Sequence, residues 1–162
     1  DEKVAAVQAI VDKHAALAKT LADAQNALNK FDADNSAKLD IEDISGLGAV
    51  NETGADGISD VFYFGSAVVA ANDGTITNFG AGDSIVLGKG FTFNSGALSA
   101  GDNNKSEFFL IQKGADVQLV IETKDFGSST VDTAVSPDAA VITLTGVNLD
   151  QLVVSDGVIS FA

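Results

Sequence analysis

The feature that most constrains the fold of this chain is the run from Asp60 to Leu87, where short strand patterns are joined by turns. Aromatic or β-branched residues alternate there with small or polar ones, which is typical of strands that bury one face. The strand patterns cover residues 60–64, 75–79 and 84–87, and the turns between them are Asn72-Asp73-Gly74 and 80–83. Glycine tolerates positive φ, and Asn and Asp side chains bond to nearby backbone amides, so these residues favour turns. No set of residues in this run is equipped to make or break a covalent bond.

Similar patterns continue to the end of the chain. Further strands are expected at residues 91–93, 106–112, 117–123, 140–147 and 152–161. Turns at intervals of about 8–12 residues are typical of antiparallel architectures. The fold class expected is therefore mainly β, an antiparallel β-sandwich or roll preceded by one long N-terminal α-helix.

That helix is expected from Glu2 to Phe31, an Ala-rich segment without Gly or Pro. One apolar seam has positions spaced alternately by three and four, and a second set recurs at sevens beside it. The seam is Val4, Val7, Val11, His14, Ala18, Leu21, Gln25 and Leu28, and the second set is Ile10, Leu17, Ala24 and Phe31. Such a helix either covers a sheet or a preceding domain, or pairs with a copy of itself as a coiled coil. His14, the only histidine, is assigned no function.

The helix leads into an acidic segment, residues 32–43, that is spaced like a twelve-residue calcium loop. Oxygen-bearing side chains stand at positions 1, 3, 5, 9 and 12, and position 7 supplies a backbone carbonyl. These residues are Asp32, Asp34, Ser36, Lys38, Asp40 and Asp43. The segment resembles an EF-hand loop, with an aspartate at the last position as in dockerin modules. This resemblance implies calcium as a cofactor. The alternative is a solvated acidic loop after the helix.

Composition excludes several classes of function. The formal net charge of -14 makes nucleic acid an unlikely partner and favours divalent cations. The absence of Cys rules out thiolate chemistry. No apolar run is long enough to span a membrane. Glu107 and Glu122 are conceivable as a pair of glycosidase carboxylates, but surface carboxylates are much commoner. We therefore expect no enzymatic activity.

Several segments together resemble the C-terminal regions of RTX proteins exported by type I secretion, in the surface-layer and adhesin branch. They are Asp60–Phe64, Asp73–Phe79, Gly82–Leu87 and 141–152, with a degenerate copy of the Gly/Asp nonapeptide of parallel β-rolls at 54–62. The resemblance implies an extracellular, cell-surface location and the type I secretion machinery as a partner. It also implies an export signal in the last strands and weaker calcium ligands at Asp56, Asp60, Asp73 and Asp83.

The expected organisation has three parts. Residues 1–43 form the long helix and the calcium-loop-like segment, 44–57 a Gly-rich connection, and 58–162 a β-domain that ends in an export-signal-like segment. The function expected is a non-enzymatic calcium-binding C-terminal domain of a secreted bacterial surface protein, with self-association or a cell-surface partner open. The alternatives are a calcium-gated protein-protein docking module and an accessory C-terminal domain of a secreted hydrolase.

Overall fold

The computed structural model describes residues 2–35, 38–45, 48–65, 67–101, 104–124 and 139–162. The chain divides into two compact units, residues 1–37 and residues 38–162.

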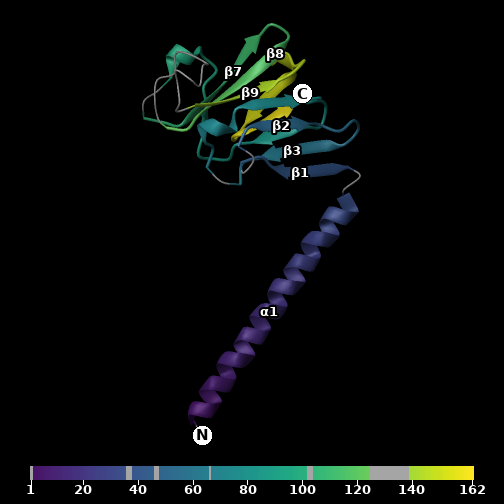
Figure 1. The fold of residues 1–162 in the computed structure, drawn as a ribbon, viewed down its shortest axis with the longest axis vertical. Coiled ribbons are helices and arrows are strands. Elements are labelled where there is room, and N and C mark those ends of the chain that lie inside the picture. Colours follow the sequence, from purple (N-terminus) through teal and green to yellow (C-terminus); the bar gives the residue numbers. More distant parts are fainter. Residues whose placement is uncertain (1, 36–37, 46–47, 66, 102–103, 125–138) are drawn as a thin grey trace. The chain divides into compact units, whose positions relative to one another are not determined.

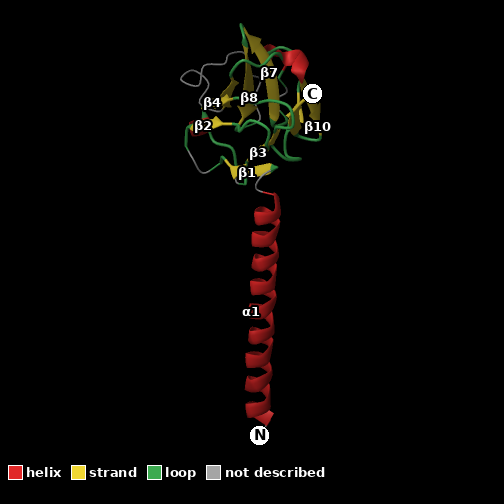
Figure 2. Ribbon diagram, turned by 90° about the vertical axis from the view of Figure 1, so that its right-hand side faces the viewer, coloured by secondary structure: helices red, strands yellow, loops and turns green. Residues whose placement is uncertain are grey.

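The first unit is a single uninterrupted α-helix, α1 (Glu2–Asn35) (Figure 2). The helix continues four residues beyond the expected end at Phe31. Side chains four residues apart stabilise its surface, as in the ion pairs Lys19–Asp23 at 2.7 Å and Lys30–Asp34 at 2.5 Å. All of its described side chains are exposed. Among the described residues, no helix is long and apolar enough to cross a membrane.

The second unit contains two mixed β-sheets, of five and six strands (Figure 1). The five-stranded sheet has the order β1-β3-β5-β11-β10, and the six-stranded sheet the order β2-β4-β9-β8-β7-β6. The strands are β1 (Leu39–Asp43), β2 (Val50–Thr53), β3 (Ser59–Tyr63), β4 (Gly74–Thr77), β5 (Ser84–Val86), β6 (Thr92–Phe93), β7 (Glu107–Lys113), β8 (Asp116–Glu122), β9 (Ala139–Leu144), β10 (Leu152–Ser155) and β11 (Val158–Phe161). The expectation of a mainly β chain with one N-terminal helix is confirmed.

The first five strands form a parallel coil, and here the antiparallel prediction is wrong. Strands β1 to β5 alternate between the two sheets, so each strand pairs with the next but one and runs parallel to it. The paired residues are 20, 24 and 23 positions apart in Leu39↔Ser59, Val50↔Gly74 and Val61↔Ser84. A chain that crosses to the opposite sheet at each turn reverses twice before it returns, which makes the returning strand parallel.

The second half of the unit is largely antiparallel, as predicted. Strands β7, β8 and β9 are antiparallel neighbours and lie side by side in Figure 1. The expected strand at 152–161 is a hairpin of β10 and β11, with its turn at Asp156-Gly157. Parallel pairs β4–β9 and β6–β7 complete the six-stranded sheet.

One hydrophobic core unites the two sheets. Phe62, Ile85 and Ile159 of the five-stranded sheet share it with residues of the six-stranded sheet such as Ile76 and Ile142, all at most 2% exposed. A smaller cluster of Leu98, Phe109, Val120 and Ala139 covers the other face of the six-stranded sheet. Neighbouring residues of β7 therefore enter different clusters, so this strand is buried on both faces.

Two strands were not expected. β1 lies within the segment interpreted as a calcium loop, and β2 lies within the Gly-rich connection. The compact unit accordingly begins at Lys38, earlier than the expected start of the β-domain at residue 58.

Candidate functional site

An aspartate occupies equivalent positions on three neighbouring strands of the five-stranded sheet. Asp40 of β1 pairs in register with Asp60 of β3, and Asp83 directly precedes β5, whose Ser84 pairs with Val61. Asp60 and Asp83 share the buried face of their strands with Phe62 and Ile85, and both aspartates are only 4% exposed. Neighbouring strands in a sheet lie about 4.8 Å apart. We call Asp40, Asp60 and Asp83 the aspartate ladder.

The turns before β3 and β5 hold the two buried carboxylates in place. The backbone N–H of Ala55 donates to Oδ2 of Asp60 at 2.6 Å. The N–H of Asp60 donates to Oδ1 of Asp83 at 2.9 Å, and the N–H of Gly80 donates to its Oδ2 at 2.7 Å. These partners are all backbone amides, so no side-chain cation neutralises either carboxylate in the part of the chain that the structure describes.

Asn78 joins the same two turns. It has a positive φ of 57°, which Asn tolerates better than most residues. Its Nδ2 donates to the carbonyl of Gly54 at 2.8 Å and to Oδ1 of Asp56 at 3.0 Å. An open cavity of ≈ 300 Å³ lies between the turns and is lined by residues that include Asp56, Asn78 and Asp83. We call the segments 54–60 and 78–83 the paired turns.

Oxygen atoms converge on Gly54. A Cβ atom at this position would lie 2.6 Å from the Asn78 carbonyl oxygen, 2.9 Å from Oδ2 of Asp60 and 3.2 Å from Oδ2 of Asp83. The first two separations are shorter than real Cβ atoms show. A side chain at position 54 would therefore displace the Asn78 carbonyl or the Asp60 carboxylate.

Electrostatics disfavour charge on Asp60, the middle residue of the ladder. Burial raises the pKa of Asp60, with smaller contributions from the neighbouring Asp83 and Asp40, against the Ala55 hydrogen bond, which lowers it. At the open edge of the sheets, burial and the adjacent Glu52 raise the pKa of Glu42. Like charges are thus held together without a counter-ion, which is unfavourable unless a proton or a cation is bound.

The donor set of the paired turns fits a hard cation. Carboxylate and carbonyl oxygens are the ligands that calcium prefers, and its flexible shell accepts backbone carbonyls and waters. No cluster of three or more His, Asp or Glu side chains suited to a metal ion occurs among the described residues. A calcium ion here would therefore have at most two carboxylate ligands, Asp60 and Asp83, and would depend on backbone carbonyl oxygens and water for the rest of its shell.

The residues of the predicted calcium loop belong to different elements. Asp32 and Asp34 lie in the last turns of α1, and Asp40 and Asp43 lie in β1, which belongs to the other unit. Asp34 accepts a bond from Lys30. Lys38 immediately precedes β1, whereas Ser36 lies outside the described residues. α1 ends at Asn35 and β1 begins at Leu39, so the segment does not form one continuous loop between two helices.

Asp43 and Asp73 have structural roles that the sequence did not reveal. Oδ1 of Asp43 accepts bonds from the N–H and the hydroxyl of Ser45 and from the N–H of Gly65. These hydrogen bonds, led by the Ser45 hydroxyl, lower the pKa of Asp43. Asp73 accepts a bond from the Val141 N–H at 2.7 Å and so joins the start of β4 to β9. Of the four weaker candidate ligands, Asp56, Asp60 and Asp83 lie in the paired turns, and Asp73 makes this separate contact.

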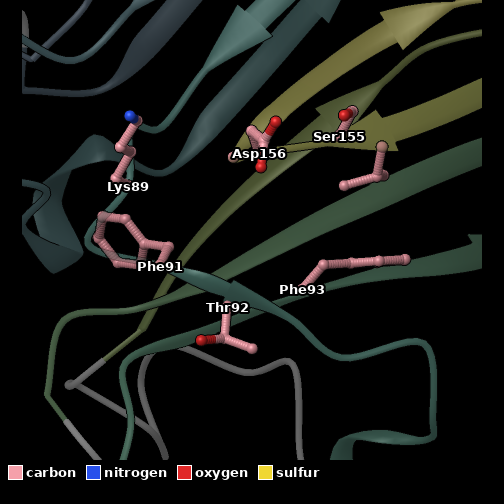
Figure 3. A pocket seen from close by; sticks show the side chains of 8 residues that line it. Lys89, Phe91, Thr92, Phe93, Ser155 and Asp156 are labelled. Carbon is pink, nitrogen blue, oxygen red and sulfur yellow. The ribbon is translucent and has the colours of Figure 1, made fainter.

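Two buried carboxylates of the six-stranded sheet have structural partners. The Glu107 backbone N–H donates to Oε2 of Glu122 at 2.9 Å, and the side-chain Nδ2 of Asn94 donates to Oε1 of Glu107 at 3.1 Å. An open cleft of ≈ 460 Å³ lies between residues 89–93 and 154–157, with Phe91 and Phe93 opposite Ser155 and Asp156 (Figure 3). Its titratable side chains are Lys89 and Asp156, which do not form an ion pair of 4.0 Å or less.

The repeat behind the ladder was missed in the sequence. Asp40-Ile-Glu-Asp-Ile44, Asp60-Val-Phe-Tyr-Phe64 and Asp83-Ser-Ile-Val-Leu87 share an aspartate followed four residues later by an apolar residue. The spacings of 20 and 23 residues equal one turn of the parallel coil. Asn78 and Gly54 were also missed as parts of the site, because Asn78 fell within an expected strand and Gly54 within the Gly-rich connection.

Comparison of the sequence with protein-family models and with curated proteins finds no match to either.

Proposed function

We propose that residues 38–162 form a non-enzymatic, calcium-binding C-terminal domain of a bacterial cell-surface protein of the surface-layer or adhesin type. The protein is exported by type I secretion, and the last strands of the domain carry the export signal. The observation that carries this proposal is the aspartate ladder at the turns of a parallel coil, because two of its carboxylates are buried with backbone amides as partners.

The segments that resemble RTX proteins support the proposal by their place in the fold. Asp60–Phe64 includes most of β3, Asp73–Phe79 spans β4, and Gly82–Leu87 spans β5. They are thus consecutive strands of one parallel coil. The degenerate nonapeptide at 54–62 forms the turn that crosses from β2 to β3 and contributes Asp60 to the ladder.

Calcium would act on this domain through stability. A cation bound between Asp60 and Asp83 would relieve the repulsion between two buried carboxylates and would bind the folded state only. Extracellular calcium modules have dissociation constants of about 0.1–1 mM. Free calcium at ten to a hundred times the dissociation constant would stabilise the fold by roughly 1.4–2.7 kcal/mol.

Calorimetric titration with calcium and thermal unfolding test the proposed site. The whole chain should bind calcium, and its unfolding temperature should rise with calcium concentration. Asp60→Asn and Asp83→Asn should each abolish most of the rise, whereas Asp150→Asn, which changes an exposed aspartate outside the ladder, should preserve it. A chain that neither binds calcium nor gains stability from it would refute the site.

The same titration distinguishes the paired turns from the docking-module alternative, in which the segment 32–43 binds the ion. Asp32→Ala and Asp34→Ala should leave the calcium response unchanged if the paired turns bind the ion. A response that is lost with these variants and retained in Asp83→Asn would favour the segment at 32–43 instead.

Export needs its own experiment, because the last strands also belong to the fold. β9 lies between β4 and β8, and β11 lies between β5 and β10, so deletion of residues 140–162 also removes the centre of both sheets. Ile76→Asp provides the control, since it buries a charge in the core outside the export segment. In a host with a type I exporter, the truncated chain should remain inside the cell and Ile76→Asp should still reach the medium. Equal retention of both chains would contradict an export signal in the last strands.

A further inference from the structure

We propose that α1 pairs with α1 of a second copy of this chain as a coiled coil. The proposal concerns the first unit and is independent of the proposed calcium site. It rests on the register of the apolar side chains, their exposure, and the distribution of charge along the chain.

Combining alternate residues of the first apolar seam with the second set gives a regular heptad seam. Positions spaced by three and four run from Val7 to Phe31, and six of the eight are large apolar residues. They are Val7, His14, Leu21 and Leu28 at one core position and Ile10, Leu17, Ala24 and Phe31 at the other. This register places Gln25 outside the core, where the first seam had placed it inside. A repeat of seven is the geometry of helix against helix, because 3.5 residues per turn keep a seam facing a partner.

The seam is exposed along its length. Relative exposures are 61% for Val7, 69% for Ile10, 61% for Leu17, 71% for Leu21 and 53% for Leu28. Most helical stability in proteins comes from packing an apolar face rather than from intrinsic propensity. At 34 residues the helix is about 51 Å long, so a matching helix would cover several heptads.

The face of the helix opposite the seam carries polar side-chain pairs. The side-chain pairs Gln8–Asp12, Lys19–Asp23 and Lys30–Asp34 join residues four apart, and all of these residues lie outside the seam. Because these side chains bond to one another along the helix, the seam is the side available for association.

Charge favours a second copy of α1 as the occupant. Residues 1–37 contain four Lys and six acidic residues, a formal charge of -2, whereas residues 38–162 contain five Lys and 17 acidic residues, a formal charge of -12. Self-association through the β-unit would bring two strongly anionic surfaces together. Association through a nearly neutral helix whose seam holds no Asp, Glu or Lys avoids that repulsion.

Sedimentation equilibrium of the whole chain in EDTA tests the proposal. The chain should be a dimer or a higher oligomer at concentrations up to about 100 µM, with dissociation on dilution. Leu17→Asp should weaken association by at least about 100-fold, and Ala16→Asp by less than about 3-fold. The two variants change adjacent residues and introduce the same charge, but only Leu17 lies in the seam.

A double variant, Leu17→Ala with Leu21→Ala, separates packing from helix propensity. Alanine is the strongest helix former, so the change removes apolar contact without disfavouring the helix. It too should dissociate the oligomer. The proposal is overturned by a chain that stays monomeric throughout this range, or by Ala16→Asp dissociating the oligomer as strongly as Leu17→Asp. Either outcome would leave the calcium titration unaffected, because that titration addresses the other unit.

Discussion

Among single residues, Gly54 has the most demanding environment in the candidate site. Gly54→Ala would place a methyl group among the Asn78 carbonyl and the carboxylates of Asp60 and Asp83. We expect a loss of about 1–3 kcal/mol in the free energy of unfolding, since backbone and buried side chains must shift. Urea denaturation without calcium measures this loss, and calcium titration of the same variant should show a reduced response.

Gly80→Ala is the matched control for this substitution. A Cβ at Gly80 would meet no atom within 4 Å, and its N–H would still donate to Asp83. Its effect should stay within about 0.5 kcal/mol. Equal losses for both variants would show that crowding at Gly54 is not the cause.

The pKa of Asp60 predicts a pH dependence. Because burial raises the pKa, the folded state holds the proton more tightly than the unfolded chain, whose Asp pKa is about 3.9. The stabilisation from protonation is therefore complete below about pH 3.9 and is lost as the pH rises through the raised pKa. In EDTA, the stability of Asp60→Asn relative to the natural chain should increase as the pH rises through the raised pKa, because only the natural chain loses the bound proton. Urea unfolding from about pH 3.5 to about pH 7 measures it.

Asp150→Asn serves as the exposed control in that series, and its stability relative to the natural chain should not follow the same pH course. A stability difference between Asp60→Asn and the natural chain that stays constant with pH would contradict the assignment of the raised pKa to Asp60.

Individual site residues were only partly predictable. Asp56, Asp60 and Asp83 were candidates because of a resemblance and their turn contexts, and the structure brings them to the paired turns. Asp40 was placed in a different site, because its spacing from Asp32 matched a calcium loop while its equivalence to Asp60 depends on strand register. Register is a long-range property that local spacing does not encode.

Among the secondary-structure elements, β2 and β4 pair through a glycine, Gly74, that leaves no room for a side chain. A Cβ at Gly74 would lie 1.6 Å from the Val50 carbonyl oxygen, on the residue with which Gly74 pairs. Glycine is therefore required for the two strands to lie together.

Gly74→Ala should separate β2 from β4 and reduce the free energy of unfolding by about 3 kcal/mol or more, because the clash is with backbone. Thermal unfolding should show the loss as a large fall in the transition temperature. Gly90→Ala, where a Cβ would meet nothing within 4 Å, should leave the transition nearly unchanged. An unchanged transition in Gly74→Ala would show that the strands do not approach as described.

Most strands were predictable, and their pairing was not. Alternation in residues 60–64, 84–87 and 117–123 reflects burial of one face or both, which the sequence records locally. β1 and β2 were missed because Leu-Asp-Ile-Glu-Asp and Val-Asn-Glu-Thr are rich in acidic and polar residues, which are common at sheet edges but depleted in strands overall. The parallel coil was missed because the sequence of a short turn does not determine whether the next strand joins the same sheet or the opposite one.

In the whole molecule, the two units should be separable. The core clusters that unite the sheets consist of residues from Ile44 onward. Removing residues 1–37 should therefore leave the β-unit folded, with its free energy of unfolding changed by less than about 0.5 kcal/mol. Circular dichroism would show the loss of helical signal with β-signal retained. Urea denaturation would reveal any larger change, and a loss of several kcal/mol would mean that the helix supports the β-unit.

The parallel coil has a consequence for how such a domain changes in length. β1 and β2 are the outermost strands of the two sheets at the end where the coil begins, and β6 to β11 complete the opposite half. A duplicated segment of one turn, inserted ahead of Leu39, can stack on β1 and β2 without altering any existing pairing. Natural variation in this domain should therefore come as insertions of about 20–24 residues at that end, matching the observed offsets between paired strands. Each added turn would carry its own aspartate, so the aspartate ladder would grow in step with the length of the coil.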